Sequence, residues 1–258
     1  MALMDREREF DGKVALITGG GAGIGFAIAR AFARAGARVA IAGRSEERLA
    51  RAAALIEEAR GTTVLTIPAD VGDPAKCDRI VAATVERFGA LDVLVNNAAL
   101  FALIPLIDAE PAETARFFRT NVEGPLNLSR AFAKWAFAHG RGGAVVNVSS
   151  IAGKRPARNL GLYCASKAAL ESLTRVMALE WAGRGLRVNA VAPGHVATEG
   201  VIEDFRAGRL DEQAMLAAIP AGRIADADDV AEAVLFLASE RARHIVGHVL
   251  TVDGGEGL

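Results

Sequence analysis

The chain contains a single tyrosine, Tyr163, which stands four residues before Lys167 in a segment with helical periodicity. Residues at i and i+4 lie on one face of a helix, so the phenol and the ammonium can share one site. A cation held within about 4–6 Å favours the phenolate and lowers a tyrosine pKa from its ordinary value of about 10. Such a tyrosine can pass a proton to or from a substrate oxygen near neutral pH. Surface pairs show the same spacing, so the pair alone does not establish an active site.

A glycine-rich segment near the start of the chain is a candidate phosphate-binding turn. Thr18 to Gly25 read T-G-G-G-A-G-I-G, between an apolar run and a helical pattern. Gly19 and Gly23 permit a tight turn and a close backbone approach, and a helix that begins near Ile24 directs free N–H groups at a pyrophosphate. Such a segment can be only a turn, but its place between a strand and a helix favours dinucleotide binding.

Strand patterns alternate with helix patterns along the chain. Short apolar runs predict strands at 13–18, 38–42, 63–67, 91–95, 144–148, 186–191 and 248–252. Apolar residues at helical spacing predict helices at 24–35, 45–60, 73–88, 111–138, 162–181 and 226–237. Strands separated by helices cannot pair as hairpins, so the sheet should be parallel with helices on both faces.

These elements predict an α/β fold, a Rossmann-type doubly wound parallel sheet of about seven strands in one domain. The domain should span 1–258, with a flexible N-terminal tail at 1–10 and a substrate lid at about 199–219. In the lid, apolar residues mix with charges, which suits a mobile cover over a ligand.

Composition argues against several classes of protein. The net charge is −1 and the basic residues form no long run, so no nucleic-acid partner is expected. No apolar run reaches the roughly 18 residues of a membrane helix, and the first residues lack an apolar signal core. We therefore expect a cytoplasmic protein without a membrane partner. The two cysteines and four histidines show no metal-ligand spacing, so no metal site is expected.

Small polar residues follow successive predicted strands. Ligands of doubly wound sheets bind at the carboxyl ends of the strands, so these residues should meet at one site. They are Asp70 and Val71 after the third strand, Asn96, Asn97, Ala98 and Ala99 after the fourth, Ser149 and Ser150 after the fifth, and Pro193 to Thr198 after the sixth.

Taken together, these segments resemble the short-chain dehydrogenase/reductase family. The resemblance runs from Lys13 to Gly255 and rests on T-G-x-x-x-G-I-G, N-N-A, Y-x-x-x-K with a serine thirteen residues earlier, P-G-x-x-x-T and V-D-G-G. It implies hydride transfer between NAD(P)(H) and a small secondary alcohol or ketone. One departure is Ala99, where the family usually has glycine.

The resemblance also implies a role for each matching residue. Tyr163 would be the acid/base, Lys167 would lower its pKa and hold the nicotinamide ribose, and Ser150 would polarise the substrate oxygen. Asn121, in T-N-V-E-G, would complete the catalytic set, and Asn96 would steady the sheet. Ser149 is the rival serine, but its side chain should point to the opposite side of the strand. The cofactor-binding residues would be Thr18, Gly19, Gly23, Ile24, Gly25, Arg44, Asp70, Val71, Asn97, Ala98, Tyr163, Lys167, Pro193, Gly194, Val196 and Thr198.

The end of the second strand bears on the choice of cofactor. NAD-binding chains place an acid there to bond the ribose 2′-OH, whereas this chain has Gly43 followed by Arg44. Arg44 can bind a 2′-phosphate in a bidentate way, although Glu46 and Glu47 weaken such a site. NADP(H) is therefore favoured over NAD(H).

The substrate is less well defined. Lys154, Arg155 and Arg158 are either solvated or attract an anionic carrier, as in a 3-oxoacyl-thioester reductase. The alternatives are an NAD-dependent alcohol or sugar dehydrogenase, an enoyl reductase or epimerase, and a non-catalytic sensor or scaffold. The spacing of Ser150 from Tyr163 favours carbonyl chemistry. The family also implies a homotetramer or homodimer.

The pair of Asn121 and Pro125 predicts an irregularity in the long helical segment. Proline has no N–H, so Pro125 cannot bond the Asn121 carbonyl, and Gly124 loosens the same turn. The helix should kink here and leave that carbonyl for an ordered water, which in the family links the catalytic lysine to solvent. The alternative is that Pro125 lies in the first turn of a separate helix.

Overall fold

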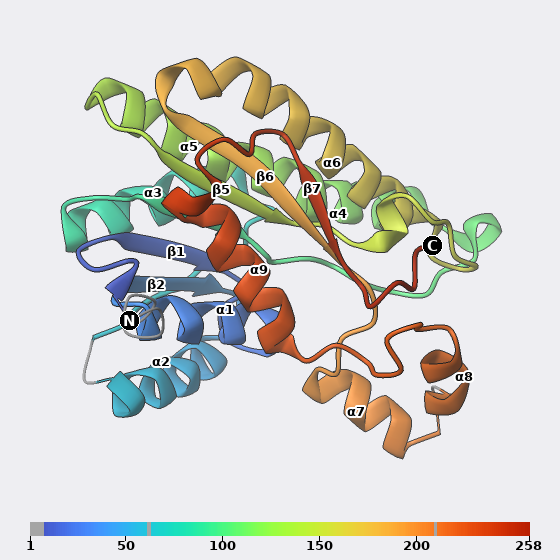
Figure 1. The fold of residues 1–258 in the computed structure, drawn as a ribbon. Helices are drawn as coiled ribbons and strands as arrows, with labels where there is room; N and C mark the ends of the chain where they lie inside the picture. Colours follow the sequence, from blue (N-terminus) through green and yellow to red (C-terminus); the bar gives the residue numbers. More distant parts are fainter. Residues whose placement is uncertain (1–7, 61–62, 209–210) are drawn as a thin grey trace.

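The computed structural model describes residues 8–60, 63–208 and 211–258 and contains a seven-stranded sheet in the order β3-β2-β1-β4-β5-β6-β7 (Figure 1). All of its strand pairs are parallel. The predicted α/β doubly wound fold is therefore confirmed. The strands are β1 (Val14–Thr18), β2 (Arg38–Gly43), β3 (Leu65–Pro68), β4 (Val93–Asn96), β5 (Gly143–Val148), β6 (Leu186–Pro193) and β7 (Val249–Val252).

Helices cover both faces of the sheet (Figure 1). One face carries α1 (Gly23–Arg34), α2 (Glu46–Arg60) and α9 (Ala227–Ala238). The other carries α3 (Pro74–Phe88), α5 (Gly124–Ala138) and α6 (Gly161–Trp181). The shorter helices are α4 (Pro111–Phe118), α7 (Glu199–Arg206) and α8 (Glu212–Ala217), and in Figure 1 α7 and α8 stand away from the sheet.

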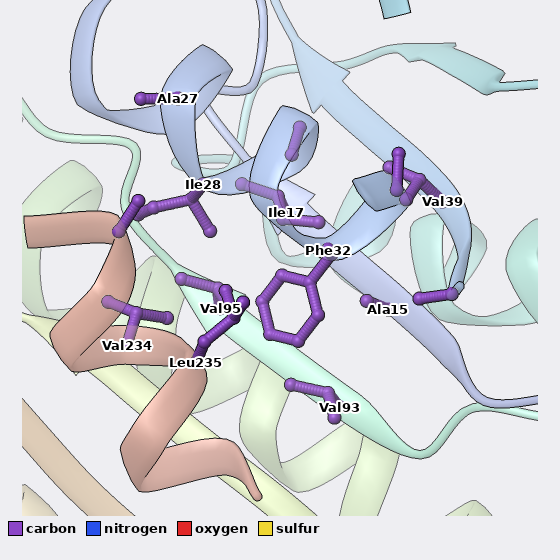
Figure 2. Close-up of a cluster of buried hydrophobic side chains, with 14 of the residues drawn as sticks. Ala15, Ile17, Ala27, Ile28, Phe32, Val39, Val93, Val95, Val234 and Leu235 are labelled. Atoms are coloured by element: carbon purple, nitrogen blue, oxygen red, sulfur yellow. The ribbon is translucent and has the colours of Figure 1, made fainter. Parts of the chain in front are cut away.

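The alternation of side chains along β1 supplies both cores. Ala15 and Ile17 point to the face covered by α1 and α9, where they pack with Phe32 and Leu235 (Figure 2). Leu16 points to the opposite face, into the core of α3, α5 and α6. Because both faces are covered, every residue of β1 is buried. A nearly continuous apolar strand is the sequence pattern typical of a parallel sheet.

A short chain of buried polar groups crosses the second core behind the ends of β4 and β5. The Asn96 amide donates to Asn147 Oδ1 at 2.8 Å, and the Asn147 amide donates to Thr174 Oγ1 at 2.8 Å. Asn96 also donates to Ser129 Oγ at 3.0 Å. All four side chains are buried, so the bonds link neighbouring strands to α5 and α6.

The structure departs from the sequence prediction at the N-terminus. Residues 1–7 of the expected tail lie outside the described residues. Phe10, which was included in that tail, is only 3% exposed and packs edge-on against Phe32 at 4.9 Å between ring centres. The expectation of a flexible tail is thus wrong at Phe10, because this aromatic side chain joins the core. Among the described helices, none has the length and apolar character needed to span a bilayer.

Candidate active site

The three residues expected to act on the substrate come from β5 and α6. Ser150 follows the end of β5, while Tyr163 and Lys167 lie in the first two turns of α6. The Lys167 Nζ donates to the Val148 carbonyl at 2.8 Å and lies 5.5 Å from the centre of the Tyr163 ring. Ser150 is hydrogen-bonded to the side chain of Tyr163. The phenol therefore has a hydroxyl on one side and a buried ammonium near its ring.

The two ionisable groups of this cluster are shifted by burial. Burial raises the pKa of Tyr163, and the hydrogen bond from Ser150 only partly opposes this change. The expected lowering of the Tyr163 pKa by Lys167 is therefore wrong for this structure. Burial also lowers the pKa of Lys167 from 10.5 to about 8, because the charged ammonium is removed from water. A lysine that is partly neutral at mildly alkaline pH exerts less charge on the phenol.

Ser149 and Ser150 point to opposite sides, as the strand alternation predicts. The Ser149 hydroxyl is buried and donates to Glu171 Oε1 at 3.0 Å. Ser150 is partly exposed, and its Oγ accepts the Ala152 N–H at 3.2 Å. Only Ser150 is thus placed beside Tyr163.

Asn121 is buried and joins the loop after β4 to α6. Its side chain accepts the Leu100 N–H at 2.7 Å and donates to the Leu100 carbonyl at 2.9 Å and to Ser166 Oγ at 3.0 Å. Ser166 in turn donates to the Tyr163 carbonyl at 2.7 Å. The Asn121 side chain therefore holds together two segments that border the site.

The chain around Asn121 forms a π-helical turn, Arg119–Glu123, between α4 and α5. The Gly124 N–H donates to the Arg119 carbonyl, five residues earlier. Pro125 lies in the first turn of α5, as the alternative expected, yet the backbone at Glu123 and Gly124 is helical, so α5 continues from the π-helical turn without a break. A β-carbon on Gly124 would lie 2.7 Å from the Val71 carbonyl oxygen, so this glycine allows the helix to approach the Asp70-Val71 segment.

The glycine-rich turn is braced from behind by Asn97. The Asn97 amide donates to the Thr18 carbonyl at 2.9 Å, and Thr18 Oγ1 accepts the N–H groups of Asn97 at 3.0 Å and Ala98 at 3.1 Å. Gly19 has a φ of 68°. A β-carbon there would lie 2.7 Å from Asn97 Nδ2. The turn therefore needs glycine at this position and leads into the N-terminus of α1.

A cavity of about 390 Å³ opens beside this turn. It fits the adenosine end of a dinucleotide, because bare glycine backbone, arginine side chains and the ends of β2, β3 and β4 enclose it. Glu46 and Glu47 are not part of its lining. The lining residues include Gly19, Gly21, Arg44, Arg48, Asp70, Val71, Asn97, Ala98 and Ala99.

The segment Pro193–Thr198 reaches the same turn from the end of β6. A β-carbon on Gly23 would lie 3.4 Å from Thr198 Cγ2, so Thr198 faces the glycine-rich turn. The Ala197 N–H donates to the Ala225 carbonyl at 2.8 Å, and the Ala225 N–H donates to the His195 carbonyl at 3.2 Å. The structure thus brings the segments after β1, β2, β3, β4, β5 and β6 to one edge of the sheet.

The loop 100–108 adds apolar side chains beside Tyr163. Phe101 packs edge-on against the Tyr163 ring at 5.1 Å between ring centres and remains 60% exposed. The Ile104 N–H donates to the Asn159 carbonyl at 2.7 Å, which joins this loop to the one after Ser150. A second cavity of about 500 Å³ lies between α7, α8 and the segment 222–224, and Ile202, Phe205 and Leu216 contribute to its lining.

Two contacts at this edge were not predicted from the sequence. Arg155, considered as a site for an anionic substrate, donates to the Glu256 carbonyl instead. The Glu256 carboxylate binds His195, which the sequence pattern did not distinguish from a structural histidine. Both bonds join segments that are far apart in the sequence, so only the folded structure shows them. Within the described residues, no group of three or more His, Cys, Asp and Glu side chains is placed to hold a metal ion.

Known proteins resemble this chain over nearly its whole length. A family model described as enoyl-(acyl carrier protein) reductase matches residues 19–256. Sorbitol dehydrogenase from Cereibacter sphaeroides is 43% identical, over 96% of this chain and 98% of that protein. Galactitol 2-dehydrogenase (L-tagatose-forming) from the same organism is 41% identical, over 95% of each. The structure of L-sorbose reductase from Gluconobacter frateurii, complexed with NADPH and L-sorbose, gives a TM-score of 0.91 at 32% identity, over 97% of this chain and 98% of that one.

Proposed function

We propose, since the chain belongs to the short-chain dehydrogenase/reductase family, that it interconverts a small polyol and the corresponding ketose. The chain is an NAD(P)-dependent oxidoreductase that acts on a secondary alcohol or a ketone. The observation that carries the proposal is the cluster of Ser150, Tyr163 and Lys167 at the carboxyl edge of the sheet. This cluster lies at the edge where the glycine-rich turn and Thr198 meet.

In the proposed mechanism the substrate oxygen lies between Ser150 and Tyr163. In the bound state NAD(P) supplies the carbon that exchanges hydride with the substrate. The Ser150 hydroxyl donates a hydrogen bond to the substrate oxygen and stabilises negative charge that develops there. Tyr163 gives its phenolic proton to that oxygen during reduction and takes it back during oxidation. The raised pKa of Tyr163 keeps the phenol protonated at neutral pH, which suits proton donation to a ketone.

The preference for a polyol rests on two observations. The relatives at 43% and 41% identity are named for sorbitol and galactitol. Arg155, one of three cations expected to attract an acyl carrier, is engaged by the Glu256 carbonyl. Both observations favour a neutral hydroxylated substrate over an anionic thioester.

For the cofactor we retain the preference for NADP(H). Gly43 and Arg44 line the proposed adenosine cavity, and Glu46 and Glu47 do not. Arg44 can therefore bind a 2′-phosphate there, and the carboxylate in the lining is that of Asp70, not of Glu46 or Glu47. A homo-oligomer is also part of the proposal, because Val176 and Leu179 on α6 are 46% and 84% exposed. Sedimentation of the purified protein tests this point.

A substrate panel tests the function. The purified chain is mixed with sorbitol, galactitol, their ketoses, simple secondary alcohols and a 3-oxoacyl thioester, each with NAD and NADP, and nicotinamide absorbance is followed. We expect turnover with polyols and ketoses and loss of that turnover in Tyr163→Phe. Turnover of the thioester alone would show that the substrate is an acyl thioester and not a polyol. Cofactor binding without any turnover would support a non-catalytic sensor.

A further inference from the structure

The last residues of the chain lie among the loops at the carboxyl edge of the sheet, where Figure 1 places the C-terminus. The Gly194 N–H donates to the Val252 carbonyl at 3.1 Å, which places the end of β7 beside the segment 193–198. The Ala221 N–H donates to the Gly254 carbonyl at 2.9 Å, which fixes the segment after α8. Arg155, from the loop after Ser150, donates to the Glu256 carbonyl. The C-terminal segment 252–257 therefore contacts three segments that border the site.

Glu256 lies in this segment, and its carboxylate is buried, with the side chain 7% exposed. Its Oε1 lies 2.8 Å from His195 Nδ1, and its Oε2 accepts the His195 backbone N–H at 3.1 Å. A carboxylate only accepts hydrogen bonds, so the imidazole must carry a proton on Nδ1. One side chain thus fixes both the backbone and the ring of His195.

The neighbouring glycine shows how closely this carboxylate approaches the chain. A β-carbon on Gly194 would lie 2.7 Å from Glu256 Oε2 and 2.8 Å from the Asp253 Cβ. The opposite side of the segment 193–198 is held by Ala225, through backbone bonds to His195 and Ala197. Glu256 and Ala225 therefore hold this segment from two sides.

We propose that Glu256, acting through His195, is a positioning residue that fixes the segment 193–198 for binding of the cofactor. This inference rests on the proposed function only in assigning that segment to the cofactor site. If the bonds between Glu256 and His195 are removed, the segment 193–198 keeps its backbone bonds to Ala225. It loses the bonds that fix the orientation of Gly194 and His195. Cofactor affinity then falls, because the segment must be ordered during binding.

A double-mutant cycle tests the pair, with Glu256→Ala, His195→Ala and the combined variant. NAD(P)H affinity is measured by fluorescence titration, and unfolding temperature is recorded in parallel. Glu256→Ala removes both bonds and should weaken the cofactor about ten-fold, as expected for charge-assisted bonds. His195→Ala keeps the backbone bond and should weaken it less, and the combined variant should be little weaker than Glu256→Ala. Glu256→Gln should restore most of the affinity, since its amide oxygen can accept the His195 backbone N–H while its NH2 group donates to Nδ1 of the other imidazole tautomer.

The control is Glu9→Gln, which breaks a bidentate pair with Arg241 remote from this edge and should leave cofactor affinity unchanged. Amide hydrogen exchange of the cofactor-free protein should show faster exchange in 193–198 for Glu256→Ala. Losses of cofactor affinity that add independently in the combined variant would overturn the proposal. A lower unfolding temperature with unchanged cofactor affinity and hydrogen exchange would also overturn it. These readouts need no turnover, so they remain informative if the proposed polyol activity is not found.

Discussion

The ammonium of Lys167 donates a hydrogen bond to the carbonyl oxygen of Val148 at 2.8 Å, at the point where β5 ends. The residues that follow Val148 are Ser149 and Ser150, so the same bond that satisfies the buried lysine also fixes the strand end from which Ser150 projects. The lysine is only 2% exposed, and its charge is consequently costly to the folded state.

This cost should appear as a pH dependence of stability. The pKa of Lys167 falls from 10.5 to about 8 on folding, so between these values the unfolded chain binds more protons and stability rises with pH. The full change corresponds to about 3 kcal/mol. In urea unfolding without cofactor, wild-type protein should gain stability relative to Lys167→Met above pH 8 and show a constant difference below it. Cys77, whose pKa is raised by burial to about 11, is present in both proteins and cancels. A difference that does not vary with pH would contradict the burial argument.

Tyr163→Phe should retain the fold and the cofactor affinity, because the ring can keep its edge contact with Phe101. Loss of the phenolic proton should lower turnover by about a hundred-fold or more. Initial rates and NAD(P)H fluorescence separate the two effects. Near-normal turnover would exclude Tyr163 as the acid/base.

The same tyrosine offers a direct spectroscopic measurement, since the chain contains one. Burial raises its pKa, so ultraviolet titration of the cofactor-free protein should show ionisation above the ordinary value of about 10. Ionisation near neutrality in that state would show that Lys167 dominates over burial.

Ser149 and Ser150 provide a matched pair of variants. Ser150→Ala removes the hydroxyl beside Tyr163 and should lower turnover by about a hundred-fold with little loss of stability. Ser149→Ala removes a bond to the buried Glu171 and should cost about 1–3 kcal/mol of stability while most turnover remains. Turnover and unfolding temperature are measured for both. The reverse pattern would assign the catalytic hydroxyl to Ser149.

Arg44→Ala should weaken NADPH by about ten-fold and NADH much less, because only NADPH carries the 2′-phosphate. Arg51→Ala, an exposed arginine on the same side of the sheet in α2, serves as the control and should affect neither cofactor. Affinities from fluorescence titration give both comparisons. Equal losses for the two cofactors would show that Arg44 does not read the phosphate.

The sequence allowed the sheet to be predicted because apolar runs and helical spacing are local properties. The clustering of Asn97, Ser150 and Thr198 followed from the rule that parallel strands end at one edge. The boundaries of β3 and β4 shifted by one or two residues, since hydrogen bonding across the sheet sets them rather than composition.

Other features depended on contacts that no local pattern encodes. The direction of the Tyr163 pKa shift depends on how deeply the assembled loops bury the phenol. The bond between Glu256 and His195 joins residues 61 positions apart. A kink that frees the Asn121 carbonyl, or a separate helix beginning at Pro125, was expected from the missing N–H. The structure has a π-helical turn at Arg119–Glu123 and places Pro125 in the first turn of α5, with Gly124 close to Val71.

The buried amides of Asn96 and Asn147 also have a consequence for how the chain finds its native pairing. The two residues are direct partners in the parallel ladder of β4 and β5. A slip of one residue would bring Asn96 opposite Val146 or Val148 and turn its amide toward the other face. The flanking residues are valines and leucines, whose side chains can pack in several alignments of the two strands. The two amides therefore favour the native alignment when the sheet forms. In a misaligned sheet the two buried amides would lack each other as hydrogen-bond partners, so that sheet would be less stable than one with the native alignment.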